Sequence, residues 1–178
     1  MRVVEGAAVV DDIDDFVATL GDVGGTHDCV VQAFDARLVA DREHLATALR
    51  YAARAHRRGD AIARDPAVET LLYAAGRRQI DRALAMGVDT GETPVVVLVA
   101  NDFPEDPLAA SDAERECAEA VASHLADATT SDASTSFAAT DPERVCEFFE
   151  IGDRERAATD ASLADLVRER VVLLSIDH

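Results

Sequence analysis

The sequence predicts a mixed α/β fold of the α+β kind, a single domain over residues 1–178 in which one mixed sheet is covered by helices. A chain of 178 residues with 48% hydrophobic residues has the length and composition of one core. Short β-branched runs are interspersed with amphipathic stretches at helical spacing. Three helical segments follow one another between the second and third strands, which excludes the strict alternation of a doubly wound sheet.

The chain opens with a predicted strand over residues 2–10. Residues 11–20 then place apolar side chains at helical spacing behind a cluster of aspartates, which suits a helix N-terminus. We expect this helix to end at the glycines Gly21, Gly24 and Gly25. Residues 29–34 predict a second strand, with residues 38–40 as a short extended continuation.

Three helices are predicted in the middle of the chain. Residues 42–58 carry a stripe of alanine and leucine on one side and arginines three and four residues apart on the other, and Gly59 stops the helix. A second helix covers residues 66–74 and has a proline in its first turn. A third helical segment covers residues 77–86, so that Gly76 forms the junction between the last two.

A buried strand is predicted for the fully apolar residues 94–100. Ser111 and Glu114 form a capping box that begins a helix reaching to about residue 128. The Thr-, Ser- and Asp-rich residues 129–136 are expected to form a solvated loop.

The C-terminal part is predicted to alternate between short strands and helices. Residues 137–140 are expected to form a strand and residues 141–149 a helix. Residues 162–167 are a further helical segment, followed by a final strand over residues 170–176.

The chain is strongly acidic, and its basic residues are all of one type. All 17 basic residues are arginine against 35 acidic residues, which gives a formal net charge of −18. Molar salt screens such repulsion, since the Debye length falls to roughly 3 Å there, so the composition indicates an extreme halophile. Residues 37–82 are an exception to this acidity, because they contain 10 arginines and only 6 acidic residues. We interpret this as the mark of a phosphate-bearing partner, with ion pairing along helix faces as the alternative.

Several classes of site lack a sequence signal. No glycine-rich loop carries the lysine of a phosphate-binding loop, and no metal-binding spacing of histidine or cysteine occurs, so we expect neither cofactor nor metal. The short apolar runs and the absence of a signal peptide predict a cytoplasmic protein without a membrane segment. The spacing permits a nucleophilic pair of Cys29 with His27, but no acid or oxyanion motif accompanies it. We therefore expect no enzyme, and a small hydrolase is the weakest hypothesis.

The arginine-rich stretch also holds both tyrosines, Tyr51 and Tyr73. Arginine and aromatic side chains together are typical of surfaces for single-stranded nucleic acid, where bases stack on rings and guanidinium planes. High salt weakens the phosphate contribution, so stacking and hydrogen bonding would carry recognition. The alternative is that both tyrosines lie at the edge of the core.

Residues 44–87 carry an ordered pattern. Its elements are His44 and Leu45 with Ala48 and Ala52, then Glu69 with Leu71 and Leu72, then Gly76-Arg77-Arg78-Gln79-Ile80, Ala83 and Gly87. In this pattern the chain resembles the family of the kinase-binding regulatory subunit of the KEOPS complex, which includes the binding protein of the p53-related protein kinase. The close match covers about 44 residues, and the flanking strands agree with the family only in order and length.

The resemblance implies a non-catalytic, mixed α/β subunit that binds the KEOPS kinase or ATPase subunit and meets the other KEOPS subunits indirectly. It implies binding of tRNA through the unpaired CCA tail, in support of threonylcarbamoyladenosine formation by a different subunit. Resemblance and local charge together assign nucleic-acid contacts to Gly76, Arg77, Arg78, Gln79, Ile80, Arg82, Arg50, Arg54, Tyr73 and His44.

The resemblance also suggests roles for some of these residues. Gly76 would permit a close turn between helices, Arg78 and Gln79 would contact phosphate or base edges, and Ile80 would line an apolar cleft for a base. The alternative function is a protein-interaction module that activates the kinase subunit without contacting tRNA. An exposed apolar face on the helix after Ser111 is a candidate for the kinase contact.

Overall fold

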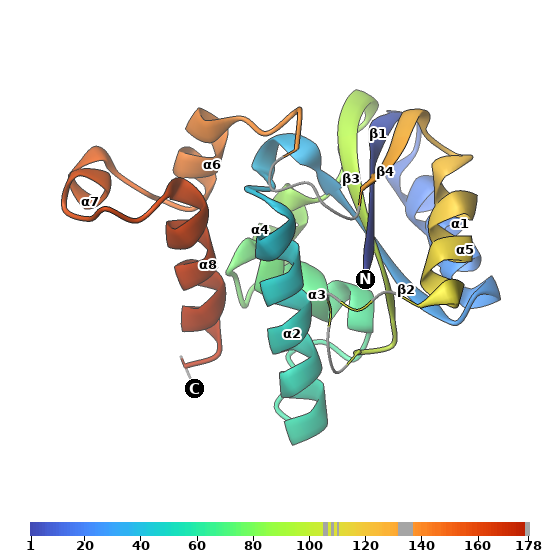
Figure 1. Cartoon of the computed structure of the whole chain (residues 1–178), viewed down its shortest axis with the longest axis horizontal. Helices are drawn as coiled ribbons and strands as arrows, with labels where there is room; N and C mark the ends of the chain where they lie inside the picture. Colours follow the sequence, from blue (N-terminus) through green and yellow to red (C-terminus); the bar gives the residue numbers. More distant parts are fainter. Residues whose placement is uncertain (105–106, 108, 110, 132–136, 177–178) are drawn as a thin grey trace.

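The computed structural model describes residues 1–104, 107, 109, 111–131 and 137–176. Its centre is a four-stranded sheet of β1 (Arg2–Val10), β2 (Cys29–Asp35), β3 (Gly91–Asn101) and β4 (Ala126–Ser131) in the order β2-β3-β1-β4 (Figure 1). Every neighbouring pair is antiparallel. The predicted class, a single helix-covered sheet in a mixed α/β fold, is confirmed, but the sheet is antiparallel rather than mixed in strand direction.

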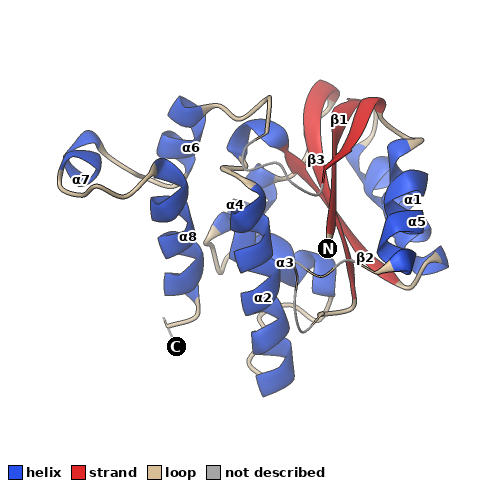
Figure 2. Cartoon of the chain, viewed as in Figure 1, coloured by secondary structure: helices blue, strands red, loops and turns tan. Residues whose placement is uncertain are grey.

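The connections explain why the sheet is antiparallel. Helix α1 (Ile13–Thr26) joins β1 to β2, and β3 lies between these two strands. Helix α5 (Asp112–Ala122) joins β3 to β4 in the same way, with β1 between them. These interleaved βαβ units give the ferredoxin-like arrangement. Figure 2 shows α1 and α5 together on one side of the sheet.

The remaining helices lie on the other side of the sheet. A long insertion between β2 and β3 contains η1 (Ala36–Leu38), α2 (Arg42–Arg58), α3 (Pro66–Ala75), α4 (Ile80–Ala83) and η2 (Leu84–Met86). The chain ends in α6 (Pro142–Phe148), α7 (Asp153–Ala157) and α8 (Leu163–Leu174). Helix α8 packs against α2, so α2 is enclosed between the sheet and the C-terminal helices (Figure 1).

Strand β3 is apolar throughout its centre because both of its faces are covered. Val95, Val97 and Val99 belong to the core beneath α1 and α5. Val96, Leu98 and Ala100 belong to the larger core beneath α2 and α3. This confirms the buried strand predicted for residues 94–100.

Helix α1 extends past the glycines that were expected to end it. It runs through Gly21, Gly24 and Gly25 to Thr26. A Cβ atom on Gly24 would lie 2.6 Å from the carbonyl oxygen of Cys29, so the missing side chain lets the helix approach β2 closely. Here glycine serves packing between helix and strand, and the predicted boundary at residue 20 was wrong.

The predicted C-terminal strand over residues 170–176 was also wrong. Helix α8 begins at a capping box formed by Ser162 with Asp165 and continues to Leu174. Its buried side chains are Leu166, Val167, Val171 and Leu174. This spacing is helical, and the face packs against α2, so tertiary burial outweighs the strand propensity of the paired valines.

The segment after α5 differs from its prediction in three ways. The helix ends at Ala122 instead of near residue 128. Residues 129–131, expected in a loop, belong to β4 and pair with β1, while residues 132–136 lie outside the described part of the chain. The predicted strand over residues 137–140 is a turn closed by a hydrogen bond from Thr140 N–H to the carbonyl oxygen of Phe137.

Two further boundaries move. The predicted extension over residues 38–40 is preceded by the 3₁₀ turn Ala36–Leu38, which Asp35 caps by accepting from the N–H of Arg37. The helical segment predicted over residues 77–86 starts only at Ile80. Among the described residues, no helix is both long and apolar enough to cross a membrane.

Candidate nucleic-acid interface

The C-terminal half of α2 carries a row of arginines on its solvent side. Arg50, Arg54, Arg57 and Arg58 are all exposed. The opposite side is buried through alanine and leucine, which confirms the predicted amphipathic helix. Basic residues in a last turn also interact favourably with the unpaired carbonyls of the helix end. In the described part of the chain, Arg54, Arg57 and Arg58 form no ion pair.

The predicted junction at Gly76 is a left-handed turn. Gly76 has φ of 60° and donates its N–H to the carbonyl oxygen of Tyr73, while Arg77 donates to Leu72. This pattern ends α3 and redirects the chain. A Cβ on Gly76 would lie 3.3 Å from the Cβ of Arg170, so glycine also allows α8 to pack against the turn. The turn predicted at Gly76 is therefore present, whereas its packing against α8 was not predicted.

The loop after Gly76 and the end of α2 meet around Tyr73. Burial raises the pKa of the Tyr73 hydroxyl, and the charges of Arg78 and Arg58 act in the opposite direction. The charges of Glu69 and Asp60 act in the same direction as burial, so Tyr73 lies among charges of both signs. A shallow depression at this position is lined by Tyr51, Arg54, Ala55, Arg58, Asp60, Tyr73 and Ser175.

The two tyrosines do not form an open stacking platform. Their rings stack on each other with centroids 6.3 Å apart and planes at 24°. Tyr73 is only 3% exposed. The adjoining depression encloses about 10 Å³, the scale of one water molecule, and is too small for a nucleobase. The geometry favours the alternative that both tyrosines lie at the edge of the core.

Arg77 and Arg50, which were predicted as ligand contacts, pair with other residues of the protein. Arg77 donates to the carbonyl oxygen of Phe148 at 2.7 Å, pairs with Glu150 at 3.0 Å and lies over the Phe148 ring. It joins the α3–α4 loop to the end of α6. Arg50 pairs with Glu43 at 3.4 Å on the exposed side of α2. Such an exposed pair contributes little and can exchange for a ligand, whereas the contacts of Arg77 are structural.

His44 lies inside the protein instead of at its surface. Its side chain is fully buried, with Nε2 at 2.8 Å from the carbonyl oxygen of Ala74. Nδ1 accepts from the N–H of Ala40, so Nε2 carries the hydrogen. Burial lowers the pKa of His44 to about 4. The ring packs α2 against α3 and is not available to a ligand.

The other predicted contacts are exposed. Arg78, Gln79, Ile80 and Arg82 all face solvent around the start of α4. Ile80 is 45% exposed and Leu84, four residues later, is 57% exposed, so they form an apolar surface pair. Arg58 was missed as a site residue, although its place in the last turn of the arginine row was a sequence signal.

Two other sequence hypotheses find no support in the geometry. The Cys29 thiol lies 3.4 Å from the carbonyl oxygen of His27, and burial raises the pKa of this thiol, which is the opposite of nucleophile activation. The apolar side of α5, a candidate for the kinase contact, is buried against the sheet through Cys117, Ala118 and Val121.

The fold and this surface define a small α/β protein with an exposed row of arginines on α2 and further exposed arginines, Arg78 and Arg82, around the start of α4. Residues 10–175 match the family model described as kinase binding protein CGI-121. Because the match spans most of the chain, the protein belongs to the CGI-121 family of kinase-binding proteins, and the resemblance found in residues 44–87 is confirmed. The comparison with curated proteins gave no match.

Proposed function

We propose that this protein is the regulatory subunit of a KEOPS-type complex that binds the kinase subunit and recruits tRNA through its single-stranded CCA tail. In this role it supports threonylcarbamoyladenosine formation, acts in the cytoplasm and performs no chemistry itself. The family assignment supports kinase binding. The observation that carries the tRNA part is the exposed row of Arg50, Arg54, Arg57 and Arg58 on α2, with Arg78 also exposed after Gly76, on a protein that is otherwise strongly acidic.

The arginine surface suits a flexible, charged strand better than a rigid base pocket. Arg54 and Arg58 approach from α2, and Arg78 with Gln79 from the loop after Gly76. Guanidinium groups donate two parallel hydrogen bonds to phosphate and stack on bases, so they keep affinity where salt screens simple charge attraction. We infer that recognition uses these exposed groups, with Arg50 and Arg82 at the margin and Arg77 holding the loop in place.

A second candidate function is a kinase-activating module that makes no contact with tRNA. The exposed apolar pair Ile80 and Leu84 favours it, because such a pair on a highly charged surface suits a protein partner. The two functions are compatible if the apolar pair binds the kinase while the arginines bind tRNA. The two functions differ in whether Ile80 contacts the kinase subunit or a base of the tRNA.

The decisive experiment measures binding of the purified protein, in molar KCl, to full-length tRNA and to the same tRNA trimmed of its CCA end. We expect trimming to weaken binding at least tenfold. The double variant Arg58→Ala with Arg78→Ala should weaken binding of intact tRNA and reduce its dependence on salt. Arg115→Ala is the control for each of the two substitutions made singly, since Arg115 lies on α5 across the sheet and its removal likewise takes away one positive charge.

A parallel pull-down with the kinase subunit separates the two functions. Leu84→Asp and Ile80→Asp should reduce kinase binding, and only Ile80→Asp should also affect tRNA if Ile80 contacts a base. Equal binding of intact and trimmed tRNA, or equal effects of the Arg115 control and each of the two single substitutions, would leave only the kinase-binding function.

A further inference from the structure

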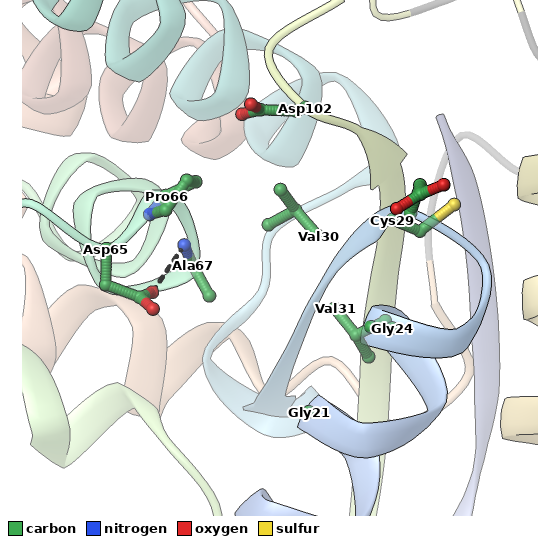
Figure 3. Close-up of a pocket in the computed structure, with 11 residues that line it drawn as sticks. Gly21, Gly24, Cys29, Val30, Val31, Asp65, Pro66, Ala67 and Asp102 are labelled. Atoms are coloured by element: carbon green, nitrogen blue, oxygen red, sulfur yellow. Dashed lines mark hydrogen bonds between the residues drawn. The ribbon is translucent and has the colours of Figure 1, made fainter.

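Strand β2 has an open edge that faces a groove. Among the described strands, β2 pairs only with β3, so its other side has no strand partner. A groove of about 570 Å³ runs along this edge (Figure 3). It lies between the glycine-rich end of α1 and the first residues of α3, with Asp102 at one end.

Backbone groups at alternate residues of β2 point away from β3. The carbonyl oxygen of Cys29 faces Gly24 of α1, and the carbonyl oxygen of Ala33 accepts from Nε2 of Gln32 at 2.8 Å. Asn101, the register partner of Cys29, gives its N–H to Glu114 instead. These observations place the backbone groups of Cys29 and Ala33 on the side away from β3. Because such groups recur at every second residue of a strand, Val31, which lines the groove, also points its N–H and carbonyl oxygen away from β3.

On the α1 side the groove is closed at Gly24, where the helix packs on β2, and open at Gly21 and Gly25. Nothing lies within 4 Å of a Cβ placed on Gly21 or Gly25, so both positions of α1 open into free space. The residues of β2 that line the groove, 29–31, span about 10 Å, which matches about three residues of an extended peptide. Val30 and Val31 supply small apolar surfaces on the two sides of the strand.

The charge of the groove selects the kind of peptide. Asp28, Asp65 and Asp102 line it, and no lysine or arginine does. Asp65 caps α3 by accepting from the N–H groups of Ala67 and Val68, so the positive end of that helix is already compensated. An acidic groove beside a free strand edge suits a peptide with basic side chains.

We propose that β2 binds an extended peptide segment carrying basic side chains, which pairs with its open edge as a fifth strand between α1 and α3. Main-chain hydrogen bonds to Val31 supply the pairing, and the three aspartates select basic side chains over acidic ones. This interface lies on the opposite edge of β2 from β3, and it does not depend on the tRNA proposal.

The test uses a six-residue peptide of alternating arginine and valine, titrated into the isotope-labelled protein in molar KCl and followed by amide chemical shifts. We expect saturable binding, with shifts at Val31, Gly21 and Gly25. The same peptide methylated on alternate backbone nitrogens keeps its charge but loses its strand-pairing donors, so it should bind at least tenfold more weakly. A peptide of alternating glutamate and valine should not bind.

A matched pair of variants locates the site. Gly21→Leu places a side chain in the groove and should weaken peptide binding at least tenfold. Thr19→Leu adds leucine to an exposed position of α1 outside the groove and should leave binding unchanged. Circular dichroism confirms that both variants fold.

Three outcomes would overturn the proposal. Equal binding of the methylated and unmethylated peptides would show charge attraction without strand pairing. Unchanged binding by Gly21→Leu would place the peptide elsewhere. A wild-type dimer that Gly21→Leu converts to a monomer, without peptide binding, would show that β2 pairs with a second copy of this chain.

Discussion

Nε2 of His44 lies 2.8 Å from the carbonyl oxygen of Ala74, which ties the first turn of α2 to the last turn of α3 inside the core. The ring also meets the edge of Phe149, with centroids 5.6 Å apart. His44 can hold these three parts of the chain together only while its ring is neutral. Among the described residues no carboxylate contacts the ring, so the charge of a second proton would not be compensated there.

This contact predicts a loss of stability in acid. The pKa of His44 is about 4 in the folded protein, against an ordinary value of 6.5, because burial penalises the charged ring. Between these values the unfolded chain binds more protons than the folded one. The free energy of unfolding should therefore keep the full contribution of His44 above pH 6.5. It should fall by on the order of 3 kcal/mol as the pH decreases from 6.5 toward 4.

Urea unfolding at pH 7.5 and 4.5, at constant high salt, measures this effect. His44→Gln keeps a donor for Ala74 but does not titrate, so its stability should depend less on pH than that of the wild type. His124→Gln removes an exposed histidine and should keep the wild-type dependence. The interpretation fails if all three proteins lose the same free energy between the two pH values.

Alanine substitutions at Gly59 and Gly76 distinguish the cost of backbone strain from the cost of steric crowding. Both have positive φ, 60° and 78°, but only Gly76 has a neighbour, Arg170, near the position of an added Cβ. Gly59→Ala should cost about 1 kcal/mol through strain alone. Gly76→Ala should cost more, because α8 must also shift. Thermal unfolding of the two variants checks the order, and equal losses would contradict the close packing of α8 on the turn.

Arg77 is expected to stabilise the fold, whereas Arg82 is not. Arg77→Ala removes the hydrogen bond to Phe148 and the ion pair with Glu150, which should lower the free energy of unfolding by about 1 to 2 kcal/mol. Arg82→Ala, at an exposed position, should stay within about 0.5 kcal/mol of the wild type. Urea unfolding distinguishes them. If Arg77→Ala left the free energy of unfolding unchanged, Arg77 would again be a candidate for a ligand contact.

Salt should raise the stability of the whole protein. The net charge of −18 makes the folded state repel itself, and molar salt screens that repulsion. We expect the unfolding temperature to rise between 0.2 M and 2 M KCl. A triple variant with Asp22→Asn, Glu116→Gln and Glu119→Gln, all at exposed positions of α1 and α5, should show a smaller rise. Full stability of the wild type at low salt would contradict the halophilic interpretation.

Elements with a strong local pattern could be predicted from the sequence. Helix α2 was predicted over its observed range, because its alanine and leucine stripe, its capping Asp41 and its terminal Gly59 all act within a few residues. Strand β3 was recognised because burial on both faces leaves an uninterrupted apolar run. The arginine row and the Gly76 turn were found for the same reason.

Elements that depend on distant partners could not be predicted in this way. β4 has a polar sequence and is a strand only because β1 offers it an edge. Glycine is found inside α1 at position 24 because the helix lies so close to the backbone of Cys29 that a side chain would not fit there. Burial of His44 needs the carbonyl of Ala74, 30 residues away in the chain.

Composition, or spacing within one segment, was enough to predict the fold class, the main helices, the charge asymmetry and the resemblance to a kinase-binding family. Which of the predicted residues are buried and which are exposed depends on the tertiary structure. The packing of separate segments buries His44 against Ala74, joins Arg77 to Phe148 and leaves one edge of β2 without a partner among the described strands, and none of these relationships can be read from one segment alone.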